Sequence, residues 1–458
     1  MTRPGEIDRR EIFGWVMYDW ANSAYITTVV TVLIGPFLTA LAQHDVGANG
    51  AVLSIGPYVV TAKSFFPYCI SLSVFLQVFM LPVLGAVADY THLKKRLMAV
   101  FCYTGAVATC LLVFVTGRRY LAGGLLLVIS NLCFGATIVL YNAYLNDITP
   151  DDQRDAVSSR GYALGYLGGG LLLAVNLATI LGAPALGISK DLAVRLSLLS
   201  AGLWWGGFSV VTFTRLKPRA GKKVSTAPLR LSRSITIGVS ELFASFRELS
   251  ALPGTLRYLI AYMFFNDGIQ TVISIASVFL AQELFVAKGL ETNESFLIGL
   301  ILMVQFVAFF GSLLFERIAA FGGTKNAILL SLFVWSGIVI YAYGFLQTTT
   351  QAWVMGAVIA LVLGGSQALS RSIFSQMIPA GREAAFFGVY EISERGTSWI
   401  GPVIFGAVVG STGSYRQAIL SLIALFVVGM VVLFLTDTNR AIRDAERVSR
   451  VHEATELS

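Results

Sequence analysis

The sequence predicts an all-α membrane protein of twelve transmembrane helices, and two observations carry that prediction. Hydrophobic residues make up 56% of the 458 residues and charged residues only 13%, whereas a soluble globular protein carries roughly a quarter charged residues. Apolar runs of about 20 residues recur along the chain, and each matches the hydrocarbon thickness of a bilayer. The net charge of +7 follows the loops and forms no basic face on a soluble domain, which excludes a nucleic-acid partner.

The apolar segments give the expected order of the helices. They fall at 13–41, 65–88, 97–115, 121–144, 157–181, 192–213, 256–281, 295–315, 326–346, 352–378, 385–410 and 415–436. Several exceed about 20 residues, which permits a tilted helix. The four cysteines lie inside these segments, and the three histidines lie in loops or in the tail. We therefore expect no disulfide, no metal site and no cofactor.

The distribution of lysine and arginine predicts the orientation. If the N-terminus lies in the cytoplasm, roughly three-quarters of the 33 basic residues fall on the cytoplasmic side, as the positive-inside rule requires. Both termini are then cytoplasmic, which needs an even number of helices. This bias and the compact loops suit an integral protein of a bacterial inner membrane, in contact with membrane lipids and expected to be a monomer.

The longest hydrophilic loop divides the chain. We predict an N-terminal six-helix bundle at 1–213, a cytoplasmic linker loop at 214–254, a C-terminal six-helix bundle at 255–437 and a cytoplasmic tail at 438–458. The second part of the linker, 235–249, is mildly amphipathic, so it either lies along the membrane surface or belongs to a disordered tether. The tail is charged and is expected to form a surface helix.

The two halves of the chain resemble each other. The first helix carries Asp19 followed at fixed spacing by a carboxamide and a hydroxyl, and the seventh repeats this pattern from Asp267. The fourth helix ends at Pro150 and the tenth at Pro379, with an arginine just beyond each proline. Parallel repeats describe the two halves of a major facilitator transporter, whose substrate site lies between the halves near the bilayer midplane. We therefore predict a major facilitator fold, with two six-helix bundles related by a pseudo-twofold axis.

The loop after the second helix carries Gly85 and Asp89 and then a basic cluster. That cluster comprises Lys94, Lys95 and Arg96. The loop resembles the major facilitator signature Gly-x-x-x-Asp followed by basic residues. In that family the acid pairs with helix ends on the cytoplasmic side and latches the outward-facing state. The resemblance implies this gating role for Asp89, with the basic cluster as its partners. The matching loop of the second half, 311–325, has no acid at that place, so a one-sided latch is expected.

Four stretches make the resemblance more specific. They read GWVMYDWANSAY at 14–25, SSRGYALGYLGGG at 158–170, FNDGIQT at 265–271 and GSQALSRS at 365–372. They resemble the vacuolar-effluxer-like branch of the major facilitator superfamily. That branch includes the autophagy-related fungal vacuolar amino-acid effluxer and bacterial permeases of undetermined substrate. The resemblance implies export of amino acids or similar small solutes.

Polar residues inside the first and seventh helices are the first candidates for the transport site. A charge at the centre of a membrane helix costs roughly 2.5–3.5 kcal/mol, so it usually faces the bundle interior. A spacing of three places Asp19 and Asn22 on one face, with Tyr25 a turn deeper. Asp267 and Gln270 are their repeat counterparts. These residues either bind a substrate ammonium or carry a proton, or they form a polar cluster for helix packing.

The eleventh helix holds a second group of buried charges. Arg395 lies four residues from Glu391 and next to Glu394. One carboxylate should neutralise the arginine, because an unpaired buried charge is costly. The other carboxylate is then free to titrate and to couple transport to protons. The alternative is a static triad that braces the helix.

Asn142 and Arg371 lie near the ends of the fourth and tenth helices and are repeat counterparts by their distance from the two prolines. Arg371 either binds a substrate carboxylate or snorkels to the cytoplasmic surface, and we favour snorkelling. Gln367, one turn earlier on the same helix, is a further candidate for substrate binding.

These patterns favour a secondary active transporter that moves a small solute by alternating access. An acid and carboxamides can bind an ammonium and an arginine can bind a carboxylate, so we expect an amino acid or a similar metabolite, with efflux favoured and protons as the coupling ion. The alternative is a polytopic membrane enzyme acting on lipids, which would need the loop acids near Asp147–Asp155 as its catalytic set. Those acids are more simply a solvated loop, and no enzymatic activity is expected.

Overall fold

The computed structural model describes residues 8–47, 50–55, 58–219, 247–291, 293–395 and 400–456. Within them, eleven helical stretches are long and apolar enough to cross a membrane. A helix suits that environment because it satisfies every backbone hydrogen bond internally. Each stretch matches one predicted segment. The remaining segment, 385–410, is represented by two shorter helices on either side of residues outside the described part. The α-helical membrane fold is confirmed, and the count of twelve stays a prediction.

The elements follow the chain in a simple order. The first part contains α1 (Arg9–Ala24), the π-helix η1 (Tyr25–Leu33), α2 (Ile34–Val46), β1 (Ala51–Ile55), β2 (Tyr58–Thr61), α3 (Ala62–Tyr90), α4 (Lys94–Leu111), η2 (Leu112–Phe114), η3 (Gly117–Arg119), α5 (Tyr120–Ile148), η4 (Asp151–Gln153), α6 (Arg154–Leu181) and α7 (Lys190–Arg215). The second part contains α9 (Pro253–Leu284), η5 (Val286–Lys288), α10 (Glu294–Gly322), α11 (Thr324–Gly344), α12 (Thr349–Gln376), α13 (Glu383–Arg395), α14 (Ile400–Thr412), α15 (Tyr415–Ser421), α16 (Ile423–Leu435) and α17 (Thr438–Glu456).

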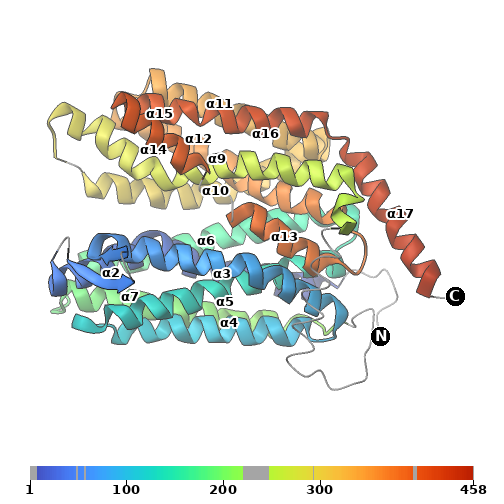
Figure 1. Ribbon diagram of the computed structural model, residues 1–458, viewed down its shortest axis with the longest axis horizontal. Helices are drawn as coiled ribbons and strands as arrows, with labels where there is room; N and C mark the ends of the chain where they lie inside the picture. Colours follow the sequence, from blue (N-terminus) through green and yellow to red (C-terminus); the bar gives the residue numbers. More distant parts are fainter. Residues whose placement is uncertain are drawn as a thin grey trace.

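The helices form two layers. Helices α1 to α7 make a first layer and α9 to α16 a second, and both chain ends lie at the same end of the molecule (Figure 1). We call this the termini end and the opposite one the far end. The layers meet where α6 packs on α10 and α12, and where α13 packs on α3 and α5. Most of the predicted linker, 220–246, lies outside the described residues, including nearly all of its amphipathic stretch. The domain boundaries therefore stay a prediction.

Local sequence explains several helix boundaries. The Asp8 side chain accepts hydrogen bonds from the Arg10 and Glu11 N–H groups at the start of α1, as an N-cap does. A capping box of Thr348 and Gln351 opens α12. Helix α9 begins with Pro253, whose missing N–H costs nothing in the first turn of a helix.

Two features were not predicted. Residues Tyr25–Leu33, in the middle of the first span, form a π-helix, a departure from α-helix that is frequent at functional sites. Residues Ala51–Ile55 and Tyr58–Thr61 pair as an antiparallel hairpin at the far end. Hydropathy detects long apolar runs, so neither a change of helix type nor a short exposed hairpin gives a signal.

The tail forms the helix α17, as predicted. Its side chains Ala441 and Ala445 are buried, and Ala441 packs against Gly254 of α9. Its arginines Arg440, Arg447 and Arg450 are exposed and pair with acids of the same helix. The tail is therefore docked on the second layer rather than detached from it.

Candidate functional site

A buried ion pair joins the two layers. Arg371 of α12 lies 3.3 Å from Asp19 of α1, measured from Nη2 to Oδ2, and the two side chains are only 3% and 10% exposed. The favoured prediction that Arg371 snorkels to the surface is therefore wrong. A carboxylate within reach compensates the buried guanidinium, so the side chain turns inward across the seam between the layers.

Neutral groups complete the environment of this pair. The Tyr141 hydroxyl donates to Asp19 Oδ2 at 2.7 Å. Arg371 donates from Nε to Ser158 Oγ and from Nη2 to the Ser158 carbonyl oxygen, each at 2.9 Å. Its Nη1 atom lies 3.4 Å from Asn142 Oδ1. All three guanidinium nitrogens thus have acceptors, which a buried arginine needs to offset its lost hydration.

Aromatic rings surround the guanidinium. Its central carbon lies 4.3 Å from the ring centre of Tyr162, 4.9 Å from Trp15 and 5.5 Å from Tyr141. The Trp15 and Tyr141 rings stack at 4.3 Å, and the indole N–H of Trp15 donates to the Tyr141 carbonyl oxygen. Rings at this range attract a cation through their electron-rich faces, so the first layer provides an aromatic binding site for the Arg371 side chain.

Gly161 of α6 leaves the space that the ion pair occupies. A Cβ atom there would overlap with Asp19 Oδ2 and lie 3.0 Å from Arg371 Nη2. We predict that Gly161→Ala lowers the free energy of unfolding by about 1–3 kcal/mol through overpacking. The measurement is thermal unfolding of the purified protein in detergent.

Gly207→Ala is the matched control, because a Cβ atom at this helical position of α7 meets nothing within 4 Å. Removing an exposed helical glycine normally stabilises by about 0.5–1 kcal/mol. Equal melting temperatures for the two variants would show that the pair does not need the space at Gly161.

Asn142 extends the network to the eleventh predicted segment. Its Nδ2 atom donates to Glu391 Oε1 of α13 at 3.2 Å, while its Oδ1 atom faces Arg371. A chain of contacts therefore runs from Asp19 through Arg371 and Asn142 to Glu391, alternating between the layers. The Arg395 side chain lies outside the described residues, so the predicted triad with Glu391 and Glu394 stays a prediction.

The other candidates on α1, η1 and α12 lie in less charged surroundings. Tyr25 is buried and its hydroxyl lies 2.9 Å from Ser130 Oγ, inside the first layer. Asn22 is buried, and its Nδ2 atom has no hydrogen-bond partner among the described residues. Gln367 accepts from the Tyr166 hydroxyl at 2.5 Å and so links α12 to α6.

The acid of the seventh helix stands apart from this network. Asp267 is fully buried, and its Oδ2 atom accepts the Gly401 N–H of α14 at 2.7 Å. Gln270 lies one turn on and contacts Asn266 of its own helix. Within the described residues, no hydrogen bond or ion pair joins Asp267 to Asp19 or Arg371. The two repeat-related acids therefore have different partners.

Asp89 lies where the loop signature places it, against a helix end of the other layer. Its two carboxylate oxygens accept the N–H groups of Ala384 and Ala385, at 2.9 and 2.8 Å, in the first turn of α13. The first turn of a helix presents unpaired N–H donors and a positive partial charge. Gly85, one turn away, allows this contact, because a Cβ atom there would overlap with the Ala384 carbonyl.

The predicted basic partners of Asp89 make their direct contacts elsewhere, although Lys94 lies close enough to stabilise the Asp89 carboxylate electrostatically. Lys94 pairs with Asp147 at 3.0 Å, Lys95 donates to the Leu216 carbonyl oxygen, and Arg96 is exposed. In the described part of the chain, none of the three forms an ion pair with Asp89. The backbone N–H groups of α13 occupy both carboxylate oxygens instead.

Further contacts close the seam at the termini end. Asn146 and Arg154 both donate to the Ser375 carbonyl oxygen, at 2.8 and 3.3 Å. Thr324, in the loop that mirrors the Asp89 loop, donates to Asp155 at 2.5 Å. The second half thus adds a contact of its own, which the prediction of a one-sided latch left out.

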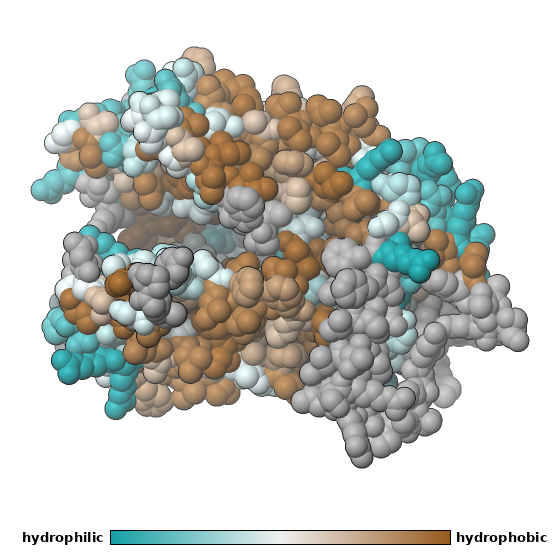
Figure 2. All heavy atoms as spheres, viewed as in Figure 1, coloured by the Kyte–Doolittle hydropathy of each residue, from teal (hydrophilic) through white to brown (hydrophobic). Residues whose placement is uncertain are grey.

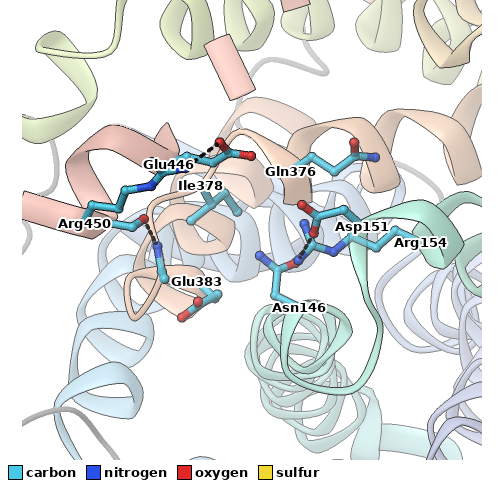
Figure 3. A pocket seen from close by; sticks show the side chains of 10 residues that line it. Asn146, Asp151, Arg154, Gln376, Ile378, Glu383, Glu446 and Arg450 are labelled. Carbon is cyan, nitrogen blue, oxygen red and sulfur yellow. Dashed lines mark hydrogen bonds and ion pairs between the residues drawn. The ribbon is translucent and has the colours of Figure 1, made fainter. Parts of the chain in front are cut away.

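Two hollows lie along the seam. At the far end, the space between the layers is open in Figure 2. At the termini end, a cavity of about 310 Å³ lies between the layers and α17. In Figure 3, Glu446 and Arg450 of α17 lie on one side of this cavity, and Asp151 and Arg154 lie on the other. The acids and arginines of each side pair with each other, so this cavity holds no unbalanced charge from those four residues.

The fold and the seam define a class of protein. Two helical layers, closed together at one end and separated at the other, form the major facilitator architecture. The human organic anion transporter MFSD10 (TETRAN) superposes with a TM-score of 0.67 at 14% identity, over 93% of this chain and 99% of that one. FucP in the outward conformation also gives 0.67, at 11% identity, over 93% and 98%. This likeness shows the fold alone.

Sequence comparison identifies the family. The model of the vacuole effluxer Atg22-like family matches residues 7–446, and the chain belongs to this family. The uncharacterized MFS-type transporter YxiO of Bacillus subtilis (strain 168) is 30% identical over 92% of this chain and 93% of its own length. Autophagy-related protein 22-1 of Penicillium rubens is 26% identical over 97% and 92%. The protein is therefore a membrane transporter and not an enzyme.

Sequence reasoning missed four residues around the ion pair. They are Trp15, Tyr141, Ser158 and Tyr162. All four are neutral, so no insertion penalty singled them out. Three of them fall within the stretches at 14–25 and 158–170 that carry the family resemblance.

Proposed function

We propose that the protein moves an amino acid or a similar zwitterionic metabolite by alternating access, with efflux favoured. The observation that carries this proposal is the Asp19–Arg371 pair across the seam. The two layers cannot separate at the termini end without breaking it. A zwitterion can replace each partner, because its ammonium can bind Asp19 and its carboxylate can bind Arg371. Neither buried charge is then left without a partner. An unpaired buried charge would cost several kcal/mol.

The orientation of the cycle follows from the positive-inside bias. We propose that both termini lie in the cytoplasm of a bacterial cell. The sealed termini end is then the inner side, and the hollow at the far end faces outward. Under this assignment, Asp89 on α13 and the Asp19–Arg371 pair hold the outward-facing state. We also propose that the protein works as a monomer.

Coupling to protons is part of the proposal. When the seam opens at the termini end, the acids of the network lose their partners from the other layer. A proton can neutralise such an acid at lower cost than leaving it charged in a dry interior. Asp19 and Glu391 are the acids of the network that this step would affect.

The test begins with ligand-induced stabilisation of the purified protein. Each of the twenty common amino acids is added separately, and a ligand that binds only the folded state raises the melting temperature. Amino acids that stabilise are then measured in counterflow across proteoliposomes. We expect saturable exchange of at least one amino acid. Its N-acetyl derivative and its methyl ester, which each lack one charge, should neither stabilise the protein nor exchange.

Protein-free liposomes and the Arg118→Gln variant serve as controls, since the Arg118 side chain is 88% exposed at the far end. Exchange of the N-acetyl derivative at the rate of the parent amino acid would contradict recognition of the ammonium by Asp19.

A further inference from the structure

Asp267 is a buried acid for which the described residues provide no balancing cation. Its Oδ2 atom accepts the Gly401 N–H at 2.7 Å. Its Oδ1 atom is buried and has no hydrogen-bond partner among the described residues. Asp267 lies fourteen residues after the start of α9, which is about 21 Å along the helix at 1.5 Å per residue. It is therefore distant from both ends of the helix. Asp19, its repeat counterpart, is held by Arg371.

In the part of the chain that the structure describes, the elements that pack on α9 offer no free positive charge near the middle of the helix. Helices α14 and α16 contain no acidic, basic or histidine residue. Helix α13 brings Tyr390, Glu391 and Glu394, and the Arg395 side chain lies outside the described residues. Arg371 of α12 is engaged by Asp19. The charges of α10, α17, α15 and η5 lie toward the helix ends, where Arg416 of α15 pairs with Glu283.

A second unpartnered group faces the same place. Thr271 lies one turn after Asp267 and is 1% exposed, and its hydroxyl has no hydrogen-bond partner among the described residues. Both side chains face Gly401, because its N–H donates to Asp267 Oδ2 and a Cβ atom on that glycine would overlap with Thr271 Oγ1. A carboxyl and a hydroxyl therefore meet the start of α14 in a buried setting.

We propose that Asp267 carries a transported proton, separate from the one that neutralises an acid of the Asp19–Glu391 network, and holds it in this conformation, an inference that rests on the proposed proton-coupled transport. An ionised carboxylate with one hydrogen bond and no counter-ion is very costly in an apolar interior, and such a group becomes neutral instead. A proton on Oδ1 removes the charge and leaves Oδ2 as the acceptor of the Gly401 N–H. A hard metal cation takes about six oxygen ligands, whereas this place offers one carboxyl and one hydroxyl.

The position of Asp267 also connects it to the seam. Helices α13 and α14 both pack on α9, and α13 packs on α3, where Asp89 caps it. Movement of α13 away from Asp89 therefore changes the surroundings of Asp267. In that step the O–H bond at Asp267 breaks, the proton passes to water on the side that has opened, and the carboxylate keeps the electron pair.

The test reads the protonation state directly and needs no substrate. Infrared spectra of the purified protein at neutral pH are recorded for the wild type, Asp267→Asn and Asp19→Asn. We expect a carbonyl band of a protonated carboxylic acid in the wild type, its loss in Asp267→Asn and its retention in Asp19→Asn, because Asp19 is paired with Arg371. A wild-type spectrum without such a band, or the same band in Asp267→Asn, overturns the proposal.

Stability gives a second readout. Asparagine resembles a neutral aspartic acid and can still accept the Gly401 N–H, so Asp267→Asn should melt at the wild-type temperature. If Asp267→Asn instead unfolds or melts well below the wild type, the neutral-acid proposal is wrong. The wild-type melting temperature is also compared when Na⁺ replaces K⁺. If it rises, and that of Asp267→Asn does not, Asp267 belongs to a sodium site and the proposal that it holds a proton is wrong.

Transport separates this inference from the proposed function. For an amino acid that exchanges in proteoliposomes, Asp267→Asn should keep counterflow and lose accumulation driven by a pH gradient. Accumulation at the wild-type level overturns the role of Asp267. If no amino acid exchanges in the wild type, the proposed substrate class fails, while the infrared result still decides whether Asp267 holds a proton.

Discussion

Replacing Arg371 by glutamine should abolish solute flux and lower the free energy of unfolding by about 3–5 kcal/mol. The substitution removes the counter-ion of the buried Asp19, which must then stay charged beside the Tyr141 hydroxyl or take up a proton, and breaking a buried ion pair from one side has costs of this size. Asp19→Asn should lower the stability by a similar amount, because it leaves the Arg371 guanidinium among aromatic rings without its carboxylate partner. Thermal or chemical unfolding in detergent and counterflow in proteoliposomes measure the two effects.

The double variant Asp19→Asn/Arg371→Gln distinguishes pairing from general disruption. Two neutral amides leave no uncompensated charge, so most of the lost stability should return while flux stays absent. Arg118→Gln is the matched control: it breaks an exposed pair with Asp45 and should cost no more than about 1 kcal/mol. Strictly additive losses in the double variant would show that Asp19 and Arg371 are not coupled.

The contrast between Asp19 and Arg371 shows what the sequence could predict. Both residues stood out because a charge inside a membrane helix is expensive. Their pairing could not be predicted, because they lie 352 residues apart and meet only through the docking of two layers. Judged by insertion cost alone, Asp19→Asn removes a buried charge and gives no reason to expect a loss of stability. The ion pair makes a loss of stability the expected result.

The helices themselves could be predicted from hydropathy. The bilayer fixes the length of an apolar run and forces its backbone into a helix, so eleven of the predicted segments match spans among the described residues. Asp89 was identified by its loop signature, but the donors to its carboxylate are the backbone N–H groups of Ala384 and Ala385. A backbone N–H donor does not depend on the residue type, so the sequence gives no sign of it. The lysines and arginine nearby were therefore taken as the partners of Asp89.

The second large effect should follow from Asp89→Ala. This change removes two hydrogen bonds to a charged acceptor, each worth about 1.5–3 kcal/mol, from the conformation in which the termini end is closed. A loss of about 3 kcal/mol shifts the ratio of closed to open molecules by more than 100-fold, since about 1.4 kcal/mol is tenfold. Because α3 and α13 belong to different layers, the loss acts on the seam and not on the folding of one layer.

Cysteine labelling can measure this shift. Ser375 is fully buried at the seam, where its carbonyl oxygen accepts from Asn146 and Arg154. A Ser375→Cys probe in a background without the native cysteines should react slowly with N-ethylmaleimide, and Asp89→Ala should speed the reaction strongly. Asp147→Ala is the matched control, because it removes an acid that pairs with Lys94 inside the first layer. If both alanine variants label at the same rate, Asp89 does not hold the seam, and the closed end must depend on the Asp19–Arg371 pair and its neighbours.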